Sequence, residues 1–403
     1  MSFVTFEESI KELEKSLDRI GLTEKVFISD ALGRVLAQDI VAEFNSPAYP
    51  TSAMDGYALK ADDMALGKVA IVGNNPAGSD SDDEVVGGTC IKTFTGSLMP
   101  KGSDTLIPIE LVEVVDNFIM IKEPVEKGKN VRAVGENFKE GETLIKKGTK
   151  LSFAQIGVLA SLNISQVEVF AKPIVGVLST GSEILDVGEQ QTNQAQIRSS
   201  NQFVLESIAK KEGAEVLRHS LIKDNKSQIK DAIQKLLAKC DIVVTTGGVS
   251  VGDYDFVKEI IAELEPEYIT KGVKLKPGQH IKIVKLGSKF LVGLPGFPYS
   301  STVTFILYVL PIIRYMMGLE PKLKYKKATL KNNFKKKTNK TEFHAGELSI
   351  NDGKYEVDFS CKKSGTSAIL TNMLGQTALV RVDVEQKELK KGDEVMILDM
   401  EDF

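Results

Sequence analysis

The chain has 403 residues, of which 42% are hydrophobic and 26% charged, and its net charge at pH 7 is -4. This length exceeds one ordinary domain of roughly 100–200 residues, so two to four units are expected. The acidic balance argues against a general nucleic-acid-binding protein, because no global positive charge attracts phosphates. The three cysteines are far apart and show neither a disulfide framework nor zinc-ligand spacing, which fits a reducing cytoplasm.

The first predicted element is a helix over 5–20. Thr5 followed by Glu8 is a capping-box pattern, and apolar residues then recur at helical spacing. This amphipathic N-terminus does not have the pattern of a signal peptide. The most apolar stretch, Val303 to Met317, is too short to cross a bilayer and is interrupted by Pro311, so we expect a buried helix and no membrane partner.

The pattern of apolar, polar and turn-forming residues changes three times along the chain. Short apolar runs separated by Gly, Pro, Asn and Asp clusters predict an inserted β-rich region. Alternating strand and helix patterns then predict a doubly wound, mostly parallel α/β sheet with helices on both faces. The last part returns to short strands, which predicts a β-barrel or sandwich. The expected domains are a discontinuous helical and extended N-terminal domain (1–42 and 140–171), an inserted β-rich domain (43–139), an α/β domain (172–317) and a C-terminal β domain (318–403).

Residues 321–340 carry nine lysines and no acidic residue. A solvated, very polar strand pair is the simpler explanation of this segment. A docking surface for an acidic partner is the alternative.

The most informative segment runs from Asp241 to Asp255, where an apolar strand ends in Thr246-Gly247-Gly248. Ligands bind beyond the carboxyl ends of parallel strands, and glycines there let backbone N–H groups approach a phosphate. Ser250 and Thr246 can add hydroxyl donors, whereas Asp253 and Asp255 would repel phosphate unless a cation lay between. The segment therefore predicts phosphate and Mg²⁺ binding. A tight turn that needs glycine is the structural alternative.

A second strand end has the same form. Ser179-Thr180-Gly181-Ser182-Glu183 joins a strand, small hydroxylated residues, a glycine and a carboxylate. Two such ends in one sheet can converge on one ligand, and Glu183 and Asp255 would then share a cation. The alternative is that Glu183 is a surface acid in a turn.

Two further loops carry residues suited to an anion. Pro277 and Gly278 stiffen a loop in which Lys274 and Lys276 supply point charges, although a solvated turn explains the same residues. In the Gly293–Ser300 stretch, Pro295 and Pro298 make a rigid strand-to-helix turn, which could form a wall for a ligand or simply begin a helix.

Asp55 is a lone carboxylate in the motif Ser52-Ala-Met-Asp-Gly-Tyr-Ala58. Taken alone, an ordinary Asp-Gly turn of a β-rich region explains it.

Together these motifs resemble the molybdopterin molybdenumtransferases, a MoeA-like family that includes the E-domain of gephyrin. Each motif alone is weak, whereas the ordered set at family spacing, from about residue 3 to 403, is specific. The matching motifs are Ser52–Ala58, Thr95-Gly96, Arg132 with Gly135-Glu136, Ser179–Glu183, Thr246–Gly252, Lys276–Gly278 and Gly293–Gly296 with Pro298.

The resemblance implies a cytoplasmic, homodimeric enzyme of molybdenum cofactor biosynthesis. Its substrates would be molybdate and adenylylated molybdopterin, the latter delivered by a separate molybdopterin adenylyltransferase that the α/β domain itself resembles. The reaction would use Mg²⁺ and release AMP. The resemblance also implies four structural domains, with the site in a cleft between the α/β domain of one subunit and the inserted domain of the other.

Residue roles carried over by the resemblance fall into three groups. Glu183, Asp255 and Asp55 would hold the metal, and Asp224 joins them as a catalytic residue. The expected substrate-binding residues are Thr95, Arg132, Asn137, Thr180, Gly181, Thr246, Gly247, Gly248, Ser250, Lys274, Lys276, Pro277, Gly278, Pro295 and Pro298.

Three positions depart from the family pattern. Asn137 stands where the family usually has Asp, Phe297 where it often has Asn, and Gln279 where it often has Lys. A metal or proton role at 137 would lose its charge. Two other functions compete with the main hypothesis: a molybdopterin adenylyltransferase that consumes ATP, and a non-enzymatic scaffold like the receptor-clustering relatives.

Overall fold

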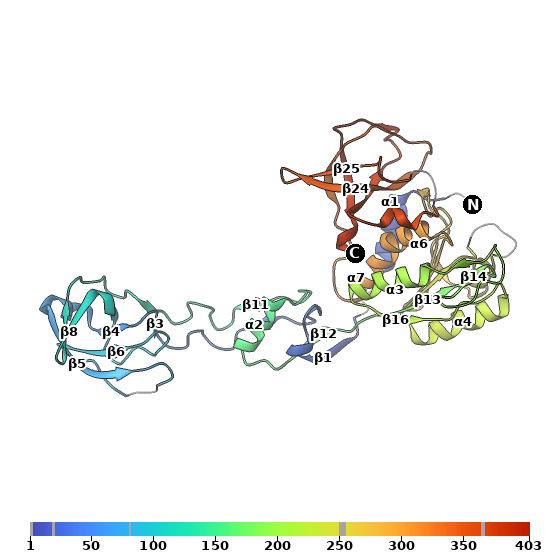
Figure 1. Cartoon of the computed structure of the whole chain (residues 1–403). Coiled ribbons are helices and arrows are strands. Elements are labelled where there is room, and N and C mark those ends of the chain that lie inside the picture. Colours follow the sequence, from blue (N-terminus) through green and yellow to red (C-terminus); the bar gives the residue numbers. More distant parts are fainter. Residues whose placement is uncertain (1–2, 18–20, 80–81, 250–254, 364–366) are drawn as a thin grey trace. The chain divides into compact units, whose positions relative to one another are not determined.

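The computed structural model describes residues 3–17, 21–79, 82–249, 255–363 and 367–403 (Figure 1). The chain forms two compact units, each with its own core. Unit 1 comprises Met1–Ala37, Gly148–Ala160 and Ile164–Phe403, and unit 2 comprises Gln38–Lys147 with Ser161–Asn163. Unit 2 is therefore inserted into unit 1, whereas the predicted four-domain division stays a prediction. Among the described residues, every helix is too short or too polar to cross a membrane.

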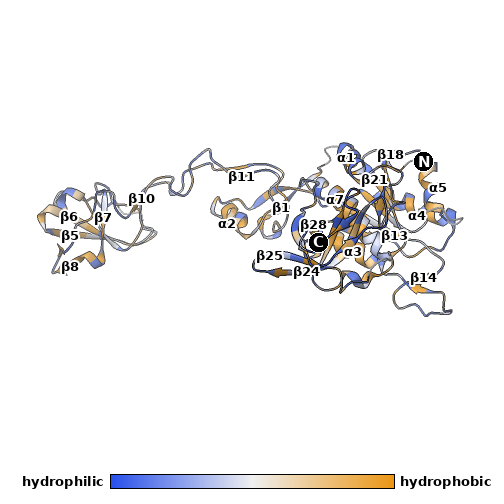
Figure 2. Cartoon of the chain, turned by 90° about the horizontal axis from the view of Figure 1, so that it is seen from above, coloured by the Kyte–Doolittle hydropathy of each residue, from blue (hydrophilic) through white to orange (hydrophobic). Residues whose placement is uncertain are grey.

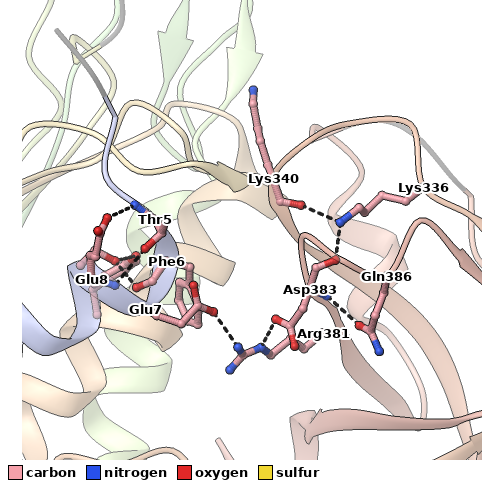
Figure 3. Close-up of polar contacts among 11 residues, drawn as sticks. Thr5, Phe6, Glu7, Glu8, Lys336, Lys340, Arg381, Asp383 and Gln386 are labelled. Atoms are coloured by element: carbon pink, nitrogen blue, oxygen red, sulfur yellow. Dashed lines mark hydrogen bonds and ion pairs between the residues drawn. The ribbon is translucent and has the colours of Figure 1, made fainter.

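Unit 1 begins with helix α1 (Phe6–Ser16), whose predicted capping box is confirmed. The Thr5 hydroxyl accepts from the Glu8 backbone N–H at 3.2 Å, and the Glu8 carboxylate accepts from the Thr5 N–H at 2.8 Å (Figure 3). The helix is shorter than the predicted 5–20, because Leu17 is extended and turns into the core. Residues 18–20 lie outside the described part of the chain.

The centre of unit 1 is a six-stranded sheet. Its first four strands are mutually parallel, and the fifth runs antiparallel to both of its neighbours, so the predicted mostly parallel sheet is confirmed. The order is β16 (Glu215–Arg218), β13 (Ile174–Ser179), β17 (Ile242–Thr246), β21 (Lys289–Leu294), β20 (Lys282–Leu286) and β18 (Glu267–Thr270).

Helices cover both faces of this sheet. Val244 of β17 packs into one hydrophobic cluster with residues of α3 (Asn201–Glu212) and of the 298–316 helical segment. Val243, the next residue back, packs into a second cluster with α4 (Lys226–Lys239) and α5 (Phe256–Glu263). Successive strand residues point to opposite faces, so the fold is doubly wound as predicted. Hydrophobic residues gather around β13, β21 and α7 in Figure 2.

The predicted buried helix over 303–317 is confirmed, but it already begins at Pro298 and is not a uniform α-helix. α6 (Pro298–Thr304) continues into a π-helical turn (Phe305–Val309) and then α7 (Leu310–Met316). Pro311 has no N–H to donate, and the wider turn directly before it accommodates the missing hydrogen bond.

The C-terminal part of unit 1 is a closed barrel, which decides between the barrel and sandwich alternatives. Five strands each pair with the next one in the sheet, and the first also pairs with the last, which closes the barrel. They are β24 (Thr341–Asn351), β25 (Lys354–Asp358), β22 (Lys326–Leu330), β28 (Glu394–Asp399) and β26 (Thr377–Val382). A short strand, β19 (Leu275–Lys276), extends β24 in parallel and connects the barrel to the α/β part.

The lysine-rich segment is largely occupied by structural contacts. Lys326 pairs with Asp399 at 2.8 Å, and Lys327 pairs with Glu394 at 2.7 Å. The ammonium of Lys336 is buried and donates to the backbone carbonyls of Lys340 and Asp383 (Figure 3). These contacts favour the structural explanation of the segment over a docking surface.

Unit 2 is built from strands, as the turn-rich sequence predicts. Its six-stranded sheet encloses a core that includes Tyr57, Leu59 and Ile107. The strand order is β7 (Thr105–Pro108), β4 (Gly56–Leu59), β6 (Thr89–Thr93), β5 (Lys68–Asn75), β9 (Phe118–Ile121) and β8 (Val112–Val115). A separate pair joins β3 (Thr51–Ser52) to β10 (Val131–Arg132).

The remaining elements are short. The pairs are β1 (Thr23–Phe27) with β12 (Gln166–Phe170), β2 (Ile40–Val41) with β11 (Thr143–Ile145), β14 (Ile184–Leu185) with β15 (Ile197–Arg198), and β23 (Phe334–Lys335) with β27 (Glu388–Leu389). The helices are α2 (Phe153–Ser161) and 3₁₀ turns at Ile28–Asp30, Ala61–Leu66, Ile109–Leu111, Leu370–Met373 and Met400–Asp402.

One buried carboxylate in the barrel should make stability depend on pH. Glu342 is 1% exposed. Burial pushes its pKa upward, but hydrogen bonds from His344 and Thr338 and the charge of Lys276 outweigh this and lower the pKa from 4.5 to about 2. A depressed carboxylate pKa stabilises the fold above 4.5, and this contribution is lost as the pH falls toward 2. The shift corresponds to about 3 kcal/mol.

We therefore expect Glu342→Gln to lower the free energy of unfolding at neutral pH. The deficit relative to wild type should shrink steadily between about pH 5 and pH 3 in denaturant titrations. A deficit that does not change with pH would contradict the assigned ionisation.

Candidate active site

Three strands of the central sheet end at the same level. Ser179 of β13 pairs with Thr246 of β17, which in turn pairs with Leu294 of β21. The hydroxyls of Ser179 and Thr246 are 2.7 Å apart. Beyond the strands, the Thr180 N–H donates to the Thr246 carbonyl at 3.2 Å and the Gly247 N–H to the Leu294 carbonyl at 3.1 Å. The three loops therefore leave the sheet side by side at the edge where α/β folds bind ligands.

Glycines allow these loops to approach one another closely. Gly247 has φ +93°, and a Cβ there would lie 3.0 Å from the carbonyl oxygen of Thr180. A Cβ on Gly296 would lie 3.6 Å from the Cα of Gly247, so the third loop also touches the second. Gly248, with φ +68°, packs directly on Val257 of α5. The result is a backbone-lined surface of the kind that accommodates a phosphate.

Asp224 and the loop after β13 form one hydrogen-bonded unit. The Ser182 N–H donates to the Asp224 carboxylate at 2.9 Å, and the Asp224 N–H donates to the Ser182 hydroxyl at 3.2 Å. A Cβ on Gly181 would lie 2.8 Å from a carboxylate oxygen of Glu183, so this exposed side chain is turned back over its own loop. The structure thus brings together three residues that are predicted to share the site.

Asp255 follows β17 and occupies the N-cap position of α5, where its side chain makes no capping hydrogen bond. Glu183 and Asp255 therefore follow neighbouring strands at one edge of the sheet. Ser250 and Asp253, which the sequence also places in this loop, lie outside the described residues. Across the described part of the chain, no group of three or more His, Cys, Asp or Glu side chains could hold a metal ion. Two carboxylates still fit Mg²⁺, since this ion commonly takes one or two carboxylates plus substrate oxygens and water.

The predicted lysine loop is held by the barrel and by α6. Lys276 pairs with the buried Glu342 at 3.8 Å, and the bond between Lys276 and Pro277 is cis. A Cβ on Gly278 would lie 2.1 Å from a methyl carbon of Thr304, so no larger residue fits there without rearrangement. The loop is therefore packed on the helix that Pro298 begins.

The other residues of these two loops have mixed environments. Lys274 is exposed, and its backbone N–H donates to the Val4 carbonyl at 2.7 Å. Gln279 accepts a hydrogen bond from the Lys340 ammonium, so at this departure from the family pattern a cation is supplied by the segment just before β24. Phe297 is 59% exposed beside the Pro295–Pro298 turn.

Sequence reasoning missed two basic residues at this edge of the sheet. Lys282 of β20 pairs with Gly293 of β21 and is only 8% exposed. Burial and the charge of Lys258 lower its pKa, and Asp255 opposes this shift. Burial and the charge of Lys282 likewise lower the pKa of His280, again opposed by Asp255. The detectable signal was a charged residue inside the otherwise apolar run from 281 to 284.

In unit 2, Asp55 and Thr95 form a close pair between strands. The Thr95 backbone N–H and hydroxyl both donate to the same Asp55 carboxylate oxygen at 2.8 Å. These two hydrogen bonds, together with the charge of Lys92, hold the Asp55 pKa below its ordinary value. Asp55 is therefore an exposed, ionised carboxylate held in one orientation. An isolated Asp-Gly turn does not require the two hydrogen bonds from Thr95.

Arg132 lies on a short strand that pairs with the strand preceding Asp55. It pairs with Thr51 across β3 and β10, and its guanidinium contacts Glu136 at 3.1 Å. Glu136 also accepts from the Ala133 N–H at 3.2 Å. The predicted residues of unit 2 thus come from three neighbouring loops.

Asn137 is anchored mainly through its backbone. Its N–H donates to the Ser46 carbonyl at 2.8 Å, and its exposed amide reaches the Ser46 hydroxyl at 3.4 Å. Because a carboxylate can accept from the same hydroxyl, Asn137→Asp should fold normally. We expect activity equal to or above wild type in steady-state assays. A marked loss would show that this chain depends on the amide.

Three family models together match most of the chain. The MoeA N-terminal region (domain I and II) matches residues 4–163, a probable molybdopterin binding domain matches 176–315, and the MoeA C-terminal region (domain IV) matches 327–400.

The similarity to individual relatives covers nearly the full length of both proteins. A molybdopterin molybdenumtransferase of Nostoc sp. is 31% identical, covering 97% of this chain and 92% of that protein, and one of Haemophilus influenzae is 30% identical, covering 98% of both. The crystal structure of a molybdopterin biosynthesis MoeA protein from Pyrococcus horikoshii is 30% identical, with a TM-score of 0.83, covering 98% of this chain and 99% of the other. The chain therefore belongs to the molybdopterin molybdenumtransferase (MoeA) family, enzymes of molybdenum cofactor biosynthesis.

Proposed function

We propose that this chain inserts molybdate into adenylylated molybdopterin in a Mg²⁺-dependent reaction that releases AMP. One observation carries the proposal: β13, β17 and β21 end at the same edge of the sheet, and beyond them lie glycine-lined loops and the carboxylates Glu183 and Asp255. Backbone N–H groups favour phosphate, whereas carboxylates repel it unless a cation is present. An adenylylated pterin phosphate with Mg²⁺ satisfies both requirements.

Each loop has a distinct part in the proposal. The Gly248 N–H donates to a phosphate oxygen, whereas the Gly247 N–H is held by the Leu294 carbonyl and Gly247 contributes close approach of the backbone. Thr180 with Gly181 lines the opposite side. Lys276, kept in place by Glu342, neutralises phosphate charge, with Lys274 beside it. The Pro295–Pro298 turn forms a rigid wall because its glycine contacts Gly247.

Glu183 and Asp255 would hold Mg²⁺ across the phosphoanhydride, with Asp55 completing the set. The ion would neutralise charge that develops as the anhydride is cleaved, which is where most of the catalysis of phosphoryl transfer lies. Asp224 positions the Glu183 loop through its two hydrogen bonds to Ser182. These side chains orient the reacting groups rather than react covalently.

The unit 2 residues would act on the site of a second copy of the chain. Asp55 is ionised and oriented by Thr95, and Arg132 offers a planar fork suited to an oxyanion such as molybdate. Because both groups are presented outward from an inserted unit, we infer a homodimer in which unit 2 of one subunit completes the α/β site of the other. A cytoplasmic enzyme of this kind would receive its substrate from a molybdopterin adenylyltransferase by transient contact.

The direct test is incubation of the protein with adenylylated molybdopterin, molybdate and Mg²⁺, followed by measurement of AMP. We expect AMP release that requires both molybdate and Mg²⁺. ATP consumption in the presence of molybdopterin, without turnover of the adenylylated form, would instead establish an adenylyltransferase. Binding of a partner protein without any turnover would establish a scaffold.

A further inference from the structure

The short segment 3–5, directly before α1, pairs with the lysine loop (272–280) of the proposed site. Val4 forms a parallel bridge with Val273. The Lys274 N–H donates to the Val4 carbonyl at 2.7 Å, and the Val4 N–H donates to the Gly272 carbonyl at 3.3 Å. On its other side, the Lys274 carbonyl accepts from the Thr341 N–H at 3.1 Å. The strand that carries the proposed substrate-binding lysines therefore has the barrel at one edge and segment 3–5 at the other.

This pairing helps to decide where the two lysines point. Val273 and Leu275 are 0% and 1% exposed and belong to the core, whereas Lys274 is exposed and Lys276 is partly exposed. Successive residues of a strand point to opposite faces, so both ammonium groups leave the strand on the face away from the core. A strand that loses a hydrogen-bonded neighbour opens more readily, so the direction of the lysines depends on the pairing with Val4.

Phe3 covers the neck of the same loop. The loop closes where the Val273 N–H donates to the Gln279 carbonyl at 3.0 Å. The Phe3 ring lies edge-on to the His280 ring, with centroids 5.6 Å apart and an angle of 80° between the planes. Gly272 has φ +152°, and a Cβ there would lie 2.3 Å from the Phe3 ring. Phe3 therefore contacts both ends of the loop, and it comes so close to the first end because that residue is a glycine.

Segment 3–5 is itself anchored by α1. Thr5, the N-cap residue of the capping box, is extended, with φ -68° and ψ 164°. The next residue, Phe6, is buried, and the centroid of its ring lies 5.4 Å from that of Phe343. Hydrogen bonds from Thr5 lower the pKa of Glu8, and the charge of Lys274 adds to this effect. The fixed start of α1 thus holds the pairing segment against the lysine loop.

We propose that segment 3–5 is a positioning element for substrate binding, which holds Lys274 and Lys276 in the geometry that receives phosphate. This inference rests on the proposed function, in which these lysines neutralise the phosphoanhydride of the substrate. The segment acts through the loop rather than on the substrate. Because the attraction between a lysine and an anion depends on their separation, a loop that opens locally binds the anion less tightly while the protein stays folded.

Three variants separate the contribution of the Phe3 ring from that of the backbone pairing. Phe3→Ala removes the ring that covers the neck of the loop. Val4→Pro removes the N–H that donates to Gly272, because proline has none. Val4→Ala is the matched control, since it keeps every backbone group and shortens a side chain that is 36% exposed. Both side chains are at least partly exposed, so the melting temperature should change little.

The quantities to measure are the rate of tryptic cleavage after Lys274, the Kd for inorganic pyrophosphate, and KM in turnover. We expect Phe3→Ala and Val4→Pro each to raise the cleavage rate and the Kd by roughly threefold to tenfold, with Val4→Ala like wild type. KM should rise more than kcat falls, because the lysines bind phosphate in the ground state as well as in the transition state.

A double-variant cycle shows whether the effect passes through the lysines. In a Lys276→Gln background, Phe3→Ala should weaken pyrophosphate binding much less than it does in wild type, since the loop then has less charge to position. A purely structural role of Phe3 would give the same loss in both backgrounds.

The proposal is overturned if Phe3→Ala and Val4→Pro bind pyrophosphate as wild type does, whether or not the loop becomes easier to cleave. It also fails if wild type does not bind pyrophosphate, or if Phe3→Ala weakens binding equally with and without Lys276. Pyrophosphate binding that depends on Phe3, without any AMP release by wild type, would refute the proposed reaction and leave the positioning role standing.

Discussion

Replacing Glu183 or Asp255 with Ala is expected to reduce Mg²⁺-dependent AMP release by at least about 100-fold. Both carboxylates follow neighbouring strands at the edge of the central sheet, where they would balance a cation beside a pyrophosphate. Neither side chain belongs to the hydrophobic core, so the variants should remain folded. Single-turnover assays across a Mg²⁺ titration measure the effect.

Glu267→Gln is the matched control for this pair. Glu267 is exposed and pairs with Lys285 at the opposite edge of the same sheet, so its charge should not affect turnover. Wild-type AMP release by either alanine variant would refute the metal-binding assignment. An equal loss in Glu267→Gln would point to the overall charge of the domain instead.

Asp55→Ala is expected to cause a loss of similar size, although Asp55 belongs to unit 2. The two hydrogen bonds from Thr95 keep this carboxylate ionised and oriented, which a simple turn does not require. Asp116→Asn, in the exposed turn between β8 and β9 of the same unit, serves as the control and should retain activity. Normal turnover by Asp55→Ala would confine the chemistry to the α/β part of the chain.

Most of the fold could be predicted from periodicity alone. Alternating strand and helix patterns gave the doubly wound sheet, because each pattern reports which faces are buried. The limits of α1 could not be predicted, since the apolar spacing continues past Ser16 while Leu17 turns into the core. The π-helical turn before Pro311 likewise depends on how one missing donor is accommodated in three dimensions.

The site was only partly predictable, for a related reason. The strand-end motifs with Gly and carboxylates could be recognised in the sequence. The register of β13, β17 and β21 shows that these three strands end at the same edge of the sheet. Lys282 interrupts an otherwise apolar run, but the sequence does not show that it is buried at the edge of the sheet where the site lies. That property depends on neighbours from distant segments, and no local spacing rule reports it.

We propose that residues of unit 2 complete the site of another copy of the chain. Unfolding and refolding an equal mixture of the inactive variants Asp55→Ala and Glu183→Ala tests this proposal. In a hybrid dimer, one site would carry both substitutions and the other neither, so activity should return to about one quarter of wild type. No recovery, with hybrids shown to form, would contradict a site shared between subunits.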